Sequence, residues 1–477
     1  MIISAPFKAG VIRNDQSGVN ANELKIKTQN TMIRKIIYLT FLLVTATVLQ
    51  AQDTDKVWSL DQCITYAYEN NIAIKRQLLN TEYQSNTLKQ SKLNRLPDLN
   101  AQMGYSFNFG YTWIQQEATN VDRNTQSFNS GIGSNVSLFK GLSMNNTIKR
   151  DKFNLMAALK TTEKIKNDIS LQITGFYLQI LFDKELLKVA KDQLETTKLQ
   201  MERTKILVDA GKLAKGKYLE LKSQSAKEAL NVTIQENNLS VSLLNLAQLL
   251  DLKNTSGFDI VSPDIPESAT ELPVAPENIY TTALDIMPQI KSSEFSLKSS
   301  EYELKMAKGN YYPSLNLNFS LGANANWLND DTNGYNRPLW DQLQTTRNYY
   351  IGASLRIPIF NKLQIRTGVN NAKLGVQDAR YQLEQEKLNL RKEIQQAYTD
   401  AIAAFKKYQS SIDAVESFKE TFRYTEEKFN VGMVNSVDYN VAKTDYLRAQ
   451  SNLLQAKYEY ILRMKILDFY RGLPLQL

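Results

Sequence analysis

Two stretches of this chain alternate strictly between apolar and polar residues. Residues 99–111 read LNAQMGYSFNFGY, and residues 315–327 read LNLNFSLGANANW. Successive side chains of a β-strand point to opposite faces, so each stretch is predicted to be a strand with one apolar and one polar face. About thirteen residues span roughly 44 Å, which exceeds the usual strand of about five or six residues. A long strand of a soluble sandwich would show the same pattern, so the rest of the chain must decide.

The composition argues against most enzyme chemistry. The 477 residues include no histidine and one cysteine, which excludes histidine-based triads, histidine metal sites and internal disulfides. We find no phosphate-binding loop, dinucleotide fingerprint or nucleophile elbow. We therefore expect no enzyme activity, no cofactor and no metal. Residues 1–51 supply +4 of the formal charge of +8, and the remaining +4 is weak evidence for nucleic-acid binding, which we do not expect.

An export segment is predicted near the N-terminus. Residues 32–51 contain a basic start at Arg34 and Lys35, an apolar run from Ile36 to Leu49, and Ala51 before a polar sequence. The apolar run is shorter than the roughly twenty residues of a membrane-spanning helix and is typical of a secretory signal peptide. We expect cleavage after Ala51, and we interpret residues 1–31 as a non-native extension before a start at Met32. A buried helix or a membrane anchor is the alternative.

The chain is predicted to be an internal duplication. Pro97-Asp-Leu-Asn matches Pro313-Ser-Leu-Asn, and Val136-Ser-Leu-Phe matches Ile357-Pro-Ile-Phe. Ala210-Gly-Lys-Leu similarly matches Val431-Gly-Met-Val, and a tyrosine follows each at the same spacing. The two structural repeats are expected at residues 52–260 and 278–477. Residues 261–277 carry four prolines and are predicted to be an extended linker between them.

Each repeat is expected to contain a helix, two strands and two further helices. In the first repeat these elements are predicted at residues 60–96, 99–112, 127–139, 143–209 and 216–250. In the second they are predicted at residues 278–311, 314–327, 347–360, 363–430 and 436–471. The sheet would therefore have four strands per chain, and a helix of about 67 residues would be roughly 100 Å long.

The long helices carry a narrow apolar seam, typical of coiled-coil packing. Its residues recur every three or four positions: Val369, Ala372, Val376, Ala379, Leu383, Leu390, Ile394, Ala397, Ala401, Ala404, Tyr408, Ile412 and Val415 in the second half, with Ile165, Ile169, Ile173, Phe176 and Ile180 in the first. An elongated periplasmic coiled-coil scaffold would account for this seam but not for the alternating strands.

Four strands cannot close a membrane barrel, because the smallest such barrels have about eight. Strand edges cannot stay open in lipid either, since each unsatisfied N–H there costs several kcal/mol. We therefore expect several copies to pool their strands, giving eight strands from two protomers or twelve from three. A stand-alone porin would account for the strands but not for the long helices. The face predicted to contact lipid carries Met103, Tyr105, Phe107, Phe109, Leu317, Phe319 and Leu321.

Other features of the strands fit a membrane setting. Tyr111, Trp113 and Trp327 lie near strand ends, where aromatic girdles meet the interface. The polar segment Asn329–Asn348 is expected to be a long extracellular loop.

The sequence resembles the TolC-like family of outer-membrane efflux channels. The resemblance lies in the LDQCITYAYENN segment (Leu60–Asn71), the P-x-L strand entries at Pro97 and Pro313, the strand exits at Phe139 and Phe360, and the duplicated glycine turns. It implies a mixed α and β membrane protein: a homotrimer whose 12-stranded outer-membrane β-barrel, four strands per protomer, continues into a long periplasmic α-helical barrel. It also implies a passive exit duct in the lipid of a Gram-negative outer membrane, with a periplasmic adaptor and an inner-membrane transporter as partners.

The resemblance also places a pore aperture at the helix turns farthest from the strands, within residues 207–218 and 428–439. Asp438 matches an acidic ring position of the family, and Gly211 and Gly432 match its tip turns. Other positions depart from the pattern. Val441 stands at the family's second acidic ring position, one turn after Asp438, and Lys217 stands at the matching site in the first half. Phe429 and Val434 replace the tyrosine and arginine of the family's gating bridges. We expect a weaker or mixed-charge constriction. A lone aspartate early in a helix is also simply a favourable N-terminal charge.

Overall fold

The computed structural model describes residues 57–114, 118–122, 124–263, 274–329, 331, 334 and 336–477. The predicted N-terminal extension, the signal peptide and most of the Pro-rich linker lie outside these residues. Apart from Ser256–Phe258, the described residues belong to one compact unit, and the description below concerns that unit.

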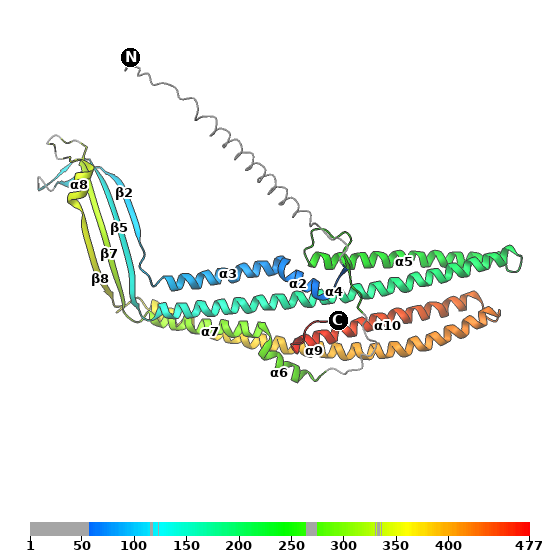
Figure 1. The fold of residues 1–477 in the computed structure, drawn as a ribbon. Helices are drawn as coiled ribbons and strands as arrows, with labels where there is room; N and C mark the ends of the chain where they lie inside the picture. The colour runs from blue at the N-terminus through cyan, green and yellow to red at the C-terminus, as the bar shows by residue number, and fades with distance from the viewer. Residues whose placement is uncertain are drawn as a thin grey trace, which may run out of the picture. The chain divides into compact units, whose positions relative to one another are not determined.

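Eight helices formed by the described residues repeat the same lengths in the two halves of the chain (Figure 1). The first half contains α2 (Leu60–Asn70), α3 (Ile72–Leu93), α4 (Ser143–Asp209) and α5 (Lys215–Leu249). The second half contains α6 (Pro276–Ile286), α7 (Pro288–Gly309), α9 (Gln364–Asn430) and α10 (Ser436–Tyr470). Corresponding helices have 11, 22, 67 and 35 residues in both halves, which supports an origin by duplication.

The first helix of each half is broken, so the single helices predicted at 60–96 and 278–311 are wrong. Asn71 and Met287 adopt extended backbone angles between the paired helices. Pro288 explains the second break, because the residue before a proline is pushed out of the helical region. Asn71 explains the first, because its Oδ1 accepts from the N–H groups of Ala73 and Ile74 and so starts a new helix.

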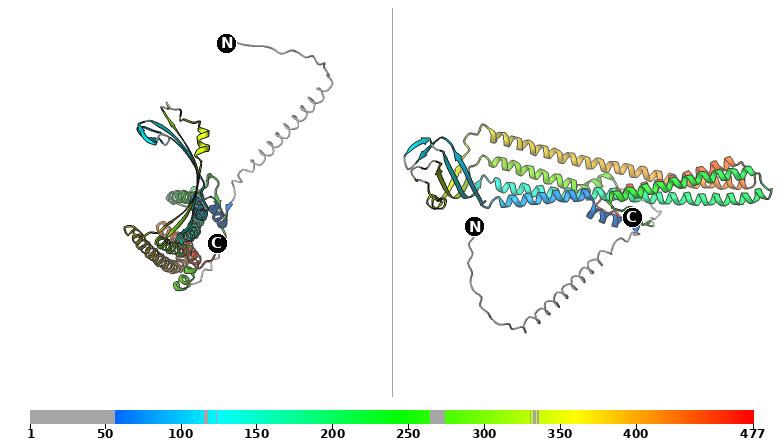
Figure 2. Two further views of the ribbon diagram at one scale, coloured as in Figure 1. Left: turned by 90° about the vertical axis from the view of Figure 1, so that its left-hand side faces the viewer. Right: turned by 90° about the horizontal axis from the view of Figure 1, so that it is seen from above.

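The predicted seam forms much of the helical core. Eight of its thirteen residues in the second half are buried in the protomer, whereas Ile412 is exposed. Leu390, Ile394, Ala397 and Ala401 of α9 pack against α6, α7 and the end of α10 in one apolar cluster. Figure 1 shows α4 beside α5 and α9 beside α10 as two pairs of helices, which overlap when seen from above in Figure 2. None of the helices formed by the described residues is long and apolar enough to cross a membrane.

Four antiparallel strands form one sheet in the order β2-β5-β7-β8 (Figure 1). Their bounds are Asn100–Asn108, Thr125–Lys140, Ser314–Leu328 and Asn348–Arg356. The first strand is therefore shorter than predicted: Tyr111–Ile114 leaves the sheet as β3 and pairs with β4 (Thr119–Asp122). The last strand ends before Pro358, which has no N–H for the ladder.

Three further elements were not expected from the sequence. The short strands β1 (Val57–Trp58) and β6 (Asp259–Ile260) pair in parallel. The predicted loop at 329–348 contains helix α8 (Leu339–Thr346), which lies against β7. β8 begins at Asn348, opposite Gly322 of β7. Farther along β7, Asn324 N–H donates to Thr346 Oγ1 at 3.0 Å and Asn326 N–H donates to Gln342 Oε1 at 2.8 Å. The segment thus satisfies the edge of β7 that β8 does not reach.

The two halves meet backbone to backbone where strands join helices. Gly141, between β5 and α4, has φ +54°, and a Cβ there would lie 2.0 Å from the carbonyl oxygen of Gly309 at the end of α7. Only glycine fits such a close approach together with a positive φ.

Gly141→Ala is expected to lower the free energy of unfolding by about 3 kcal/mol or more, because the two backbones must separate and alanine is strained at positive φ. The helical Gly175, with nothing within 4 Å of its Cβ direction, serves as the control. Gly175→Ala is expected to stay within about 1 kcal/mol of the unchanged protein. Denaturant unfolding followed by helical circular dichroism in detergent would measure both. Equal stability of the two variants would contradict the close approach.

Candidate functional site

The two turns farthest from the sheet have the same geometry. Gly211 has φ +71° in the turn between α4 and α5, and Gly432 has φ +78° in the turn between α9 and α10. In the first turn Lys212 N–H donates to Leu207 O at 2.8 Å and Gly211 N–H donates to Val208 O at 2.9 Å. The second turn repeats both bonds from Met433 and Gly432. These are Schellman motifs, in which a glycine ends the helix and satisfies its last carbonyl groups.

The structure brings two of the predicted aperture residues together across the two turns. Lys217, in the first turn of α5, places its Nζ 5.3 Å from the ring centroid of Phe429 near the end of α9. Phe429 also packs against Tyr439, with the two ring centroids 4.7 Å apart in a stacked arrangement. Lys217 also lies 3.7 Å from the carboxylate of Glu220. The lysine charge therefore links the two halves of the chain through a cation–π contact.

The other predicted aperture residues stand apart from this cluster. Asp438 and Val441 are exposed on the first two turns of α10, and Val434 is half-buried in the turn before it. Asn435 caps α10, with its Oδ1 accepting from the N–H groups of Val437 at 2.8 Å and Asp438 at 2.9 Å. Asp438 makes no ion pair with any described residue, so its charge faces solvent at the helix N-terminus.

A row of aromatic rings that was not predicted from the sequence lies behind these turns. Phe422 lies 5.5 Å from Tyr439 and 5.9 Å from Tyr446, measured between ring centroids. Tyr439 is buried, and its hydroxyl accepts from Gln200 Nε2 of α4 at 3.4 Å. Burial raises the pKa of Tyr439, so the phenol stays protonated and apolar packing is preserved. The seven-residue spacing of the phenylalanines and of the tyrosines would have indicated this row.

A buried charged network, also missed, joins the halves about two turns into α10. Lys443 is 5% exposed, and its Nζ donates to Thr197 Oγ1 of α4 at 2.9 Å and to Glu228 Oε1 of α5 at 3.2 Å. Gln224 and Gln193 donate to the same Glu228 oxygen. The second oxygen, Oε2, is buried without a partner among the described residues. This network fixes α10 against the α4–α5 pair.

Lys443→Ala is expected to destabilise the protein by about 3–5 kcal/mol, because it leaves the Glu228 carboxylate buried without its cation. The control is Lys191→Ala, which removes an exposed ion pair between Lys191 of α4 and Glu236 of α5, whose charged atoms are 2.9 Å apart. We expect that change to cost about 1 kcal/mol or less. Denaturant unfolding in detergent would compare them, and similar losses in both would show that burial does not matter at this pair.

The sheet separates apolar from polar side chains. Strand register places Met103, Tyr105 and Phe107 on the same face as Leu317, Phe319 and Leu321, through rows such as Ala101–Ile132–Leu321–Tyr349. This face is largely exposed in the protomer. The opposite face carries mainly asparagine, serine, glutamine and glycine. Phe109 follows the end of β2 and is also exposed.

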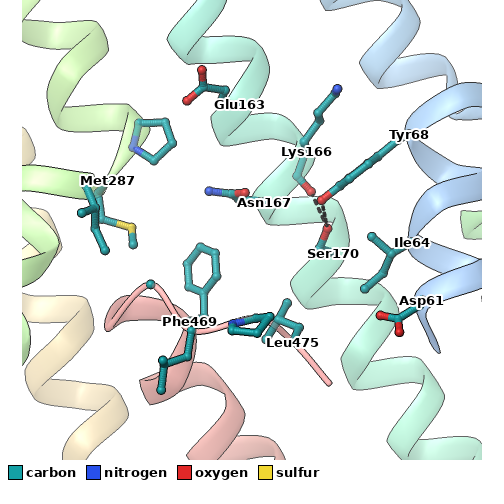
Figure 3. Close-up of a pocket in the computed structure, with 15 residues that line it drawn as sticks. Asp61, Ile64, Tyr68, Glu163, Lys166, Asn167, Ser170, Met287, Phe469 and Leu475 are labelled. Atoms are coloured by element: carbon teal, nitrogen blue, oxygen red, sulfur yellow. Dashed lines mark hydrogen bonds between the residues drawn. The ribbon is translucent and has the colours of Figure 1, made fainter. Parts of the chain in front are cut away.

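A cavity of about 490 Å³ lies beside α2 and α4, the α6–α7 break and the C-terminal segment (Figure 3). Tyr68 Oη lies 2.8 Å from Ser170 Oγ, and Lys166 Nζ lies 5.1 Å from the Tyr68 ring centroid. Asp61 and Glu163 also line the cavity. Because the lining carries charges of both signs, it favours no single class of ligand.

Known proteins are similar to this chain in sequence, and solved structures are similar to it in fold. The profile of the family described as "Outer membrane efflux protein" matches residues 279–470. The probable outer membrane lipoprotein SilC of Salmonella typhimurium is 20% identical over 414 residues, covering 84% of this chain and 82% of that protein. The alkaline protease secretion protein AprF of Pseudomonas aeruginosa is 19% identical over 381 residues, covering 77% and 76%.

The solved structures agree with these relatives. The Campylobacter jejuni CmeC outer membrane channel has a TM-score of 0.69 at 19% identity and covers 88% of this chain and 87% of its own. At that identity the similarity establishes the fold: long helices combined with antiparallel strands.

Proposed function

Because this chain belongs to the TolC-like family of outer membrane efflux proteins, we propose that it is the exit duct of a tripartite efflux or secretion system. The protein is an outer-membrane channel of a Gram-negative cell, and it conducts passively what an inner-membrane transporter exports through a periplasmic adaptor. The observation that carries the proposal is a sheet with one exposed apolar face and one polar face, continuous with two helices of 67 residues. Passive conduction requires no catalytic residue.

The open edges of the sheet support a trimer. Within one protomer β2 and β8 are the outer strands, and among the described residues each has one side without a strand partner. Lipid leaves no water to satisfy such edges, so strands of neighbouring copies must pair with them. Three copies would contribute twelve strands, with Met103, Phe107, Phe319 and their neighbours facing lipid and the polar face lining the lumen.

The detergent-corrected mass of the protein extracted from an outer-membrane fraction is expected to be three times that of the mature chain. The reason is that four strands per copy cannot close without partners. Light scattering combined with refractive index would measure it. A monomeric mass, or recovery in the soluble periplasmic fraction, would contradict the trimeric duct.

Exposed apolar side chains at the two turns support docking of the adaptor there. Val431, Met433 and Val437 are 71%, 74% and 66% exposed, and Leu213 in the turn of the first half is 40% exposed. Apolar residues at a solvent-exposed turn favour contact with another protein surface. The basic residues Lys212 and Lys215 beside them would attract acidic groups on that partner.

We assign the narrowest part of the duct to the same turns. Three copies of Asp438 facing one pore would attract cations and repel anions. Lys217 is held against Phe429 and Glu220, so its charge is partly offset. The absence of the family's gating tyrosine and arginine leaves the Lys217–Phe429 contact and the Gln200–Tyr439 hydrogen bond as interactions that join the two hairpins at this end.

Asp438→Asn is expected to lower the ratio of cation to anion permeability at least twofold, because it removes three carboxylates from the constriction without changing side-chain size. Reversal potentials under a potassium chloride gradient in a planar bilayer would measure it. Asp192→Asn, an exposed change in the second half of α4 away from the turn, should leave the ratio within experimental error. An unchanged ratio for Asp438→Asn would remove that residue from the pore.

Two other functions fit less of the structure. A coiled-coil scaffold would use the long helices but would have no need for an exposed apolar sheet face. A stand-alone porin would use the strands but not the helices. Both features belong to one compact unit here, which favours the duct.

A further inference from the structure

A second cavity, of about 500 Å³, lies where the strands meet the helices. Ten of its eleven lining residues are polar or basic, and none is acidic. The two basic residues are Lys140, at the end of β5, and Arg356, at the end of β8. A polar cavity with two cations and no carboxylate in its wall differs from the mixed-charge cavity beside α2.

Strand register places both cations in one row on the polar face. Lys140 lies opposite Ser314, and Ser314 lies opposite Arg356 on the next strand. Directly paired residues point to the same face, and neighbouring strands are about 4.8 Å apart, so the two Cα atoms are roughly 10 Å apart. The adjoining row pairs Ser137 with Asn316, which also line the cavity.

No carboxylate of the described residues neutralises these positive charges. Neither Lys140 nor Arg356 forms an ion pair with a described residue. The nearby carboxylate of Asp98 is occupied, because it accepts from Asn135 N–H at 2.5 Å and from Asn100 Nδ2 at 3.1 Å. Lys140 also borders an adjoining cavity lined by Glu303, but the two side chains form no ion pair.

A buried hydroxyl group supplies an independent indication of a ligand. Ser137 Oγ lines this cavity, is shielded from solvent and has no hydrogen-bond partner among the described residues. Buried polar atoms are nearly always paired, so an unpaired hydroxyl in a cavity lined by two cations indicates a missing hydrogen-bond partner. Lysine, arginine and hydroxyl donors together match the oxygens of a phosphate or carboxylate group.

We propose that this cavity is a binding site for anionic solutes that carry phosphate or carboxylate groups, held by Lys140, Arg356 and Ser137 on their way through the duct. The inference rests on the proposed function, because only in the duct does the polar face line a lumen. Three copies would then place six positive charges around one passage, which concentrates anions there. The charge is opposite in sign to that of Asp438 at the far end of the helices.

The test is calorimetric titration of inorganic pyrophosphate into the full chain purified in neutral detergent. The double variant K140Q/R356Q is expected to bind pyrophosphate at least tenfold more weakly than the unchanged protein. K140R/R356K keeps both charges and is expected to stay within about threefold. Ser137→Ala should weaken binding twofold to fivefold, because it removes one neutral donor.

Circular dichroism of each variant would establish that it is folded. If K140Q/R356Q does not fold, the comparison of Ser137→Ala and K140R/R356K with the unchanged protein decides: unaltered binding in Ser137→Ala would overturn the inference. Absence of pyrophosphate binding to the unchanged protein, or equal binding to K140Q/R356Q, would also overturn it.

Two further measurements distinguish the solute site from a lipid-headgroup site and from the proposed duct function. Dihexanoyl phosphatidylglycerol tests for a lipid headgroup: binding of this lipid that depends on Lys140 and Arg356, without pyrophosphate binding, would overturn the solute site. Bilayer recordings test the duct: pyrophosphate added on the strand side should reduce the current of the unchanged protein more than that of K140Q/R356Q. A protein that binds pyrophosphate but forms no channel would refute the proposed function and leave the site, whereas a channel that binds no pyrophosphate would refute the site alone.

Discussion

The structure depends on how the backbone groups at the edges of a four-stranded sheet are satisfied. β5 and β7 have strand neighbours on both sides, but β8 covers only the part of β7 from Ser314 to Gly322. The remaining edge of β7 bonds to side chains from the segment that carries α8, including Gln342 and Thr346. No segment of the described part of the chain covers the outer sides of β2 and β8 in this way. In lipid the backbone N–H and C=O groups at these edges require strands from other copies. The cover of β7 by the α8 segment and the proposed trimer therefore follow from the same need to pair backbone groups.

The duplication explains why the helices of the two halves have matching lengths, and a few asymmetric contacts join the two halves into one unit. Helices of equal length place the strand junctions and the helix turns at matching heights. At one end Gly141 and Gly309 allow the two backbones to touch. Towards the other end Lys443 crosses to Thr197 and Glu228 inside the packed helices. Since a buried ion pair is costly to break, this crossing restrains movement of α9 and α10 relative to α4 and α5.

Charge is distributed unevenly along the proposed duct. The strand end carries the Lys140–Arg356 row on its polar face, and the far turns carry exposed Asp438 together with Lys217. The Phe429 ring, stacked on Tyr439 and covered by Lys217, occupies a position where the family resemblance implies a polar gating residue. Cation–π and aromatic contacts depend less on salt concentration than exposed ion pairs do, which would make this end less sensitive to ionic strength.

Much of the local structure was determined by the sequence alone, because period-two and three-four patterns depend only on side-chain directions along one element. The helix predicted at 143–209 has those same bounds, and the strand predicted at 314–327 ends one residue later. Pro288 also marked the break at Met287, although the single-helix prediction ignored it. Asn71 was harder to interpret, because its amide donates to the carbonyl oxygen of Leu249 far along the chain.

Only the tertiary structure decided which distant residues meet. Lys443 and Thr197 are 246 positions apart in sequence, and no local pattern indicates that a lysine on α10 is buried against α4. The alignment of Lys140, Ser314 and Arg356 depends on strand register and on a bulge between Ser137 and Phe139 that restores the polar face. A one-residue slip would turn these side chains to the opposite face. Sequence periodicity therefore determined the elements, whereas pairing register and helix packing determined the sites.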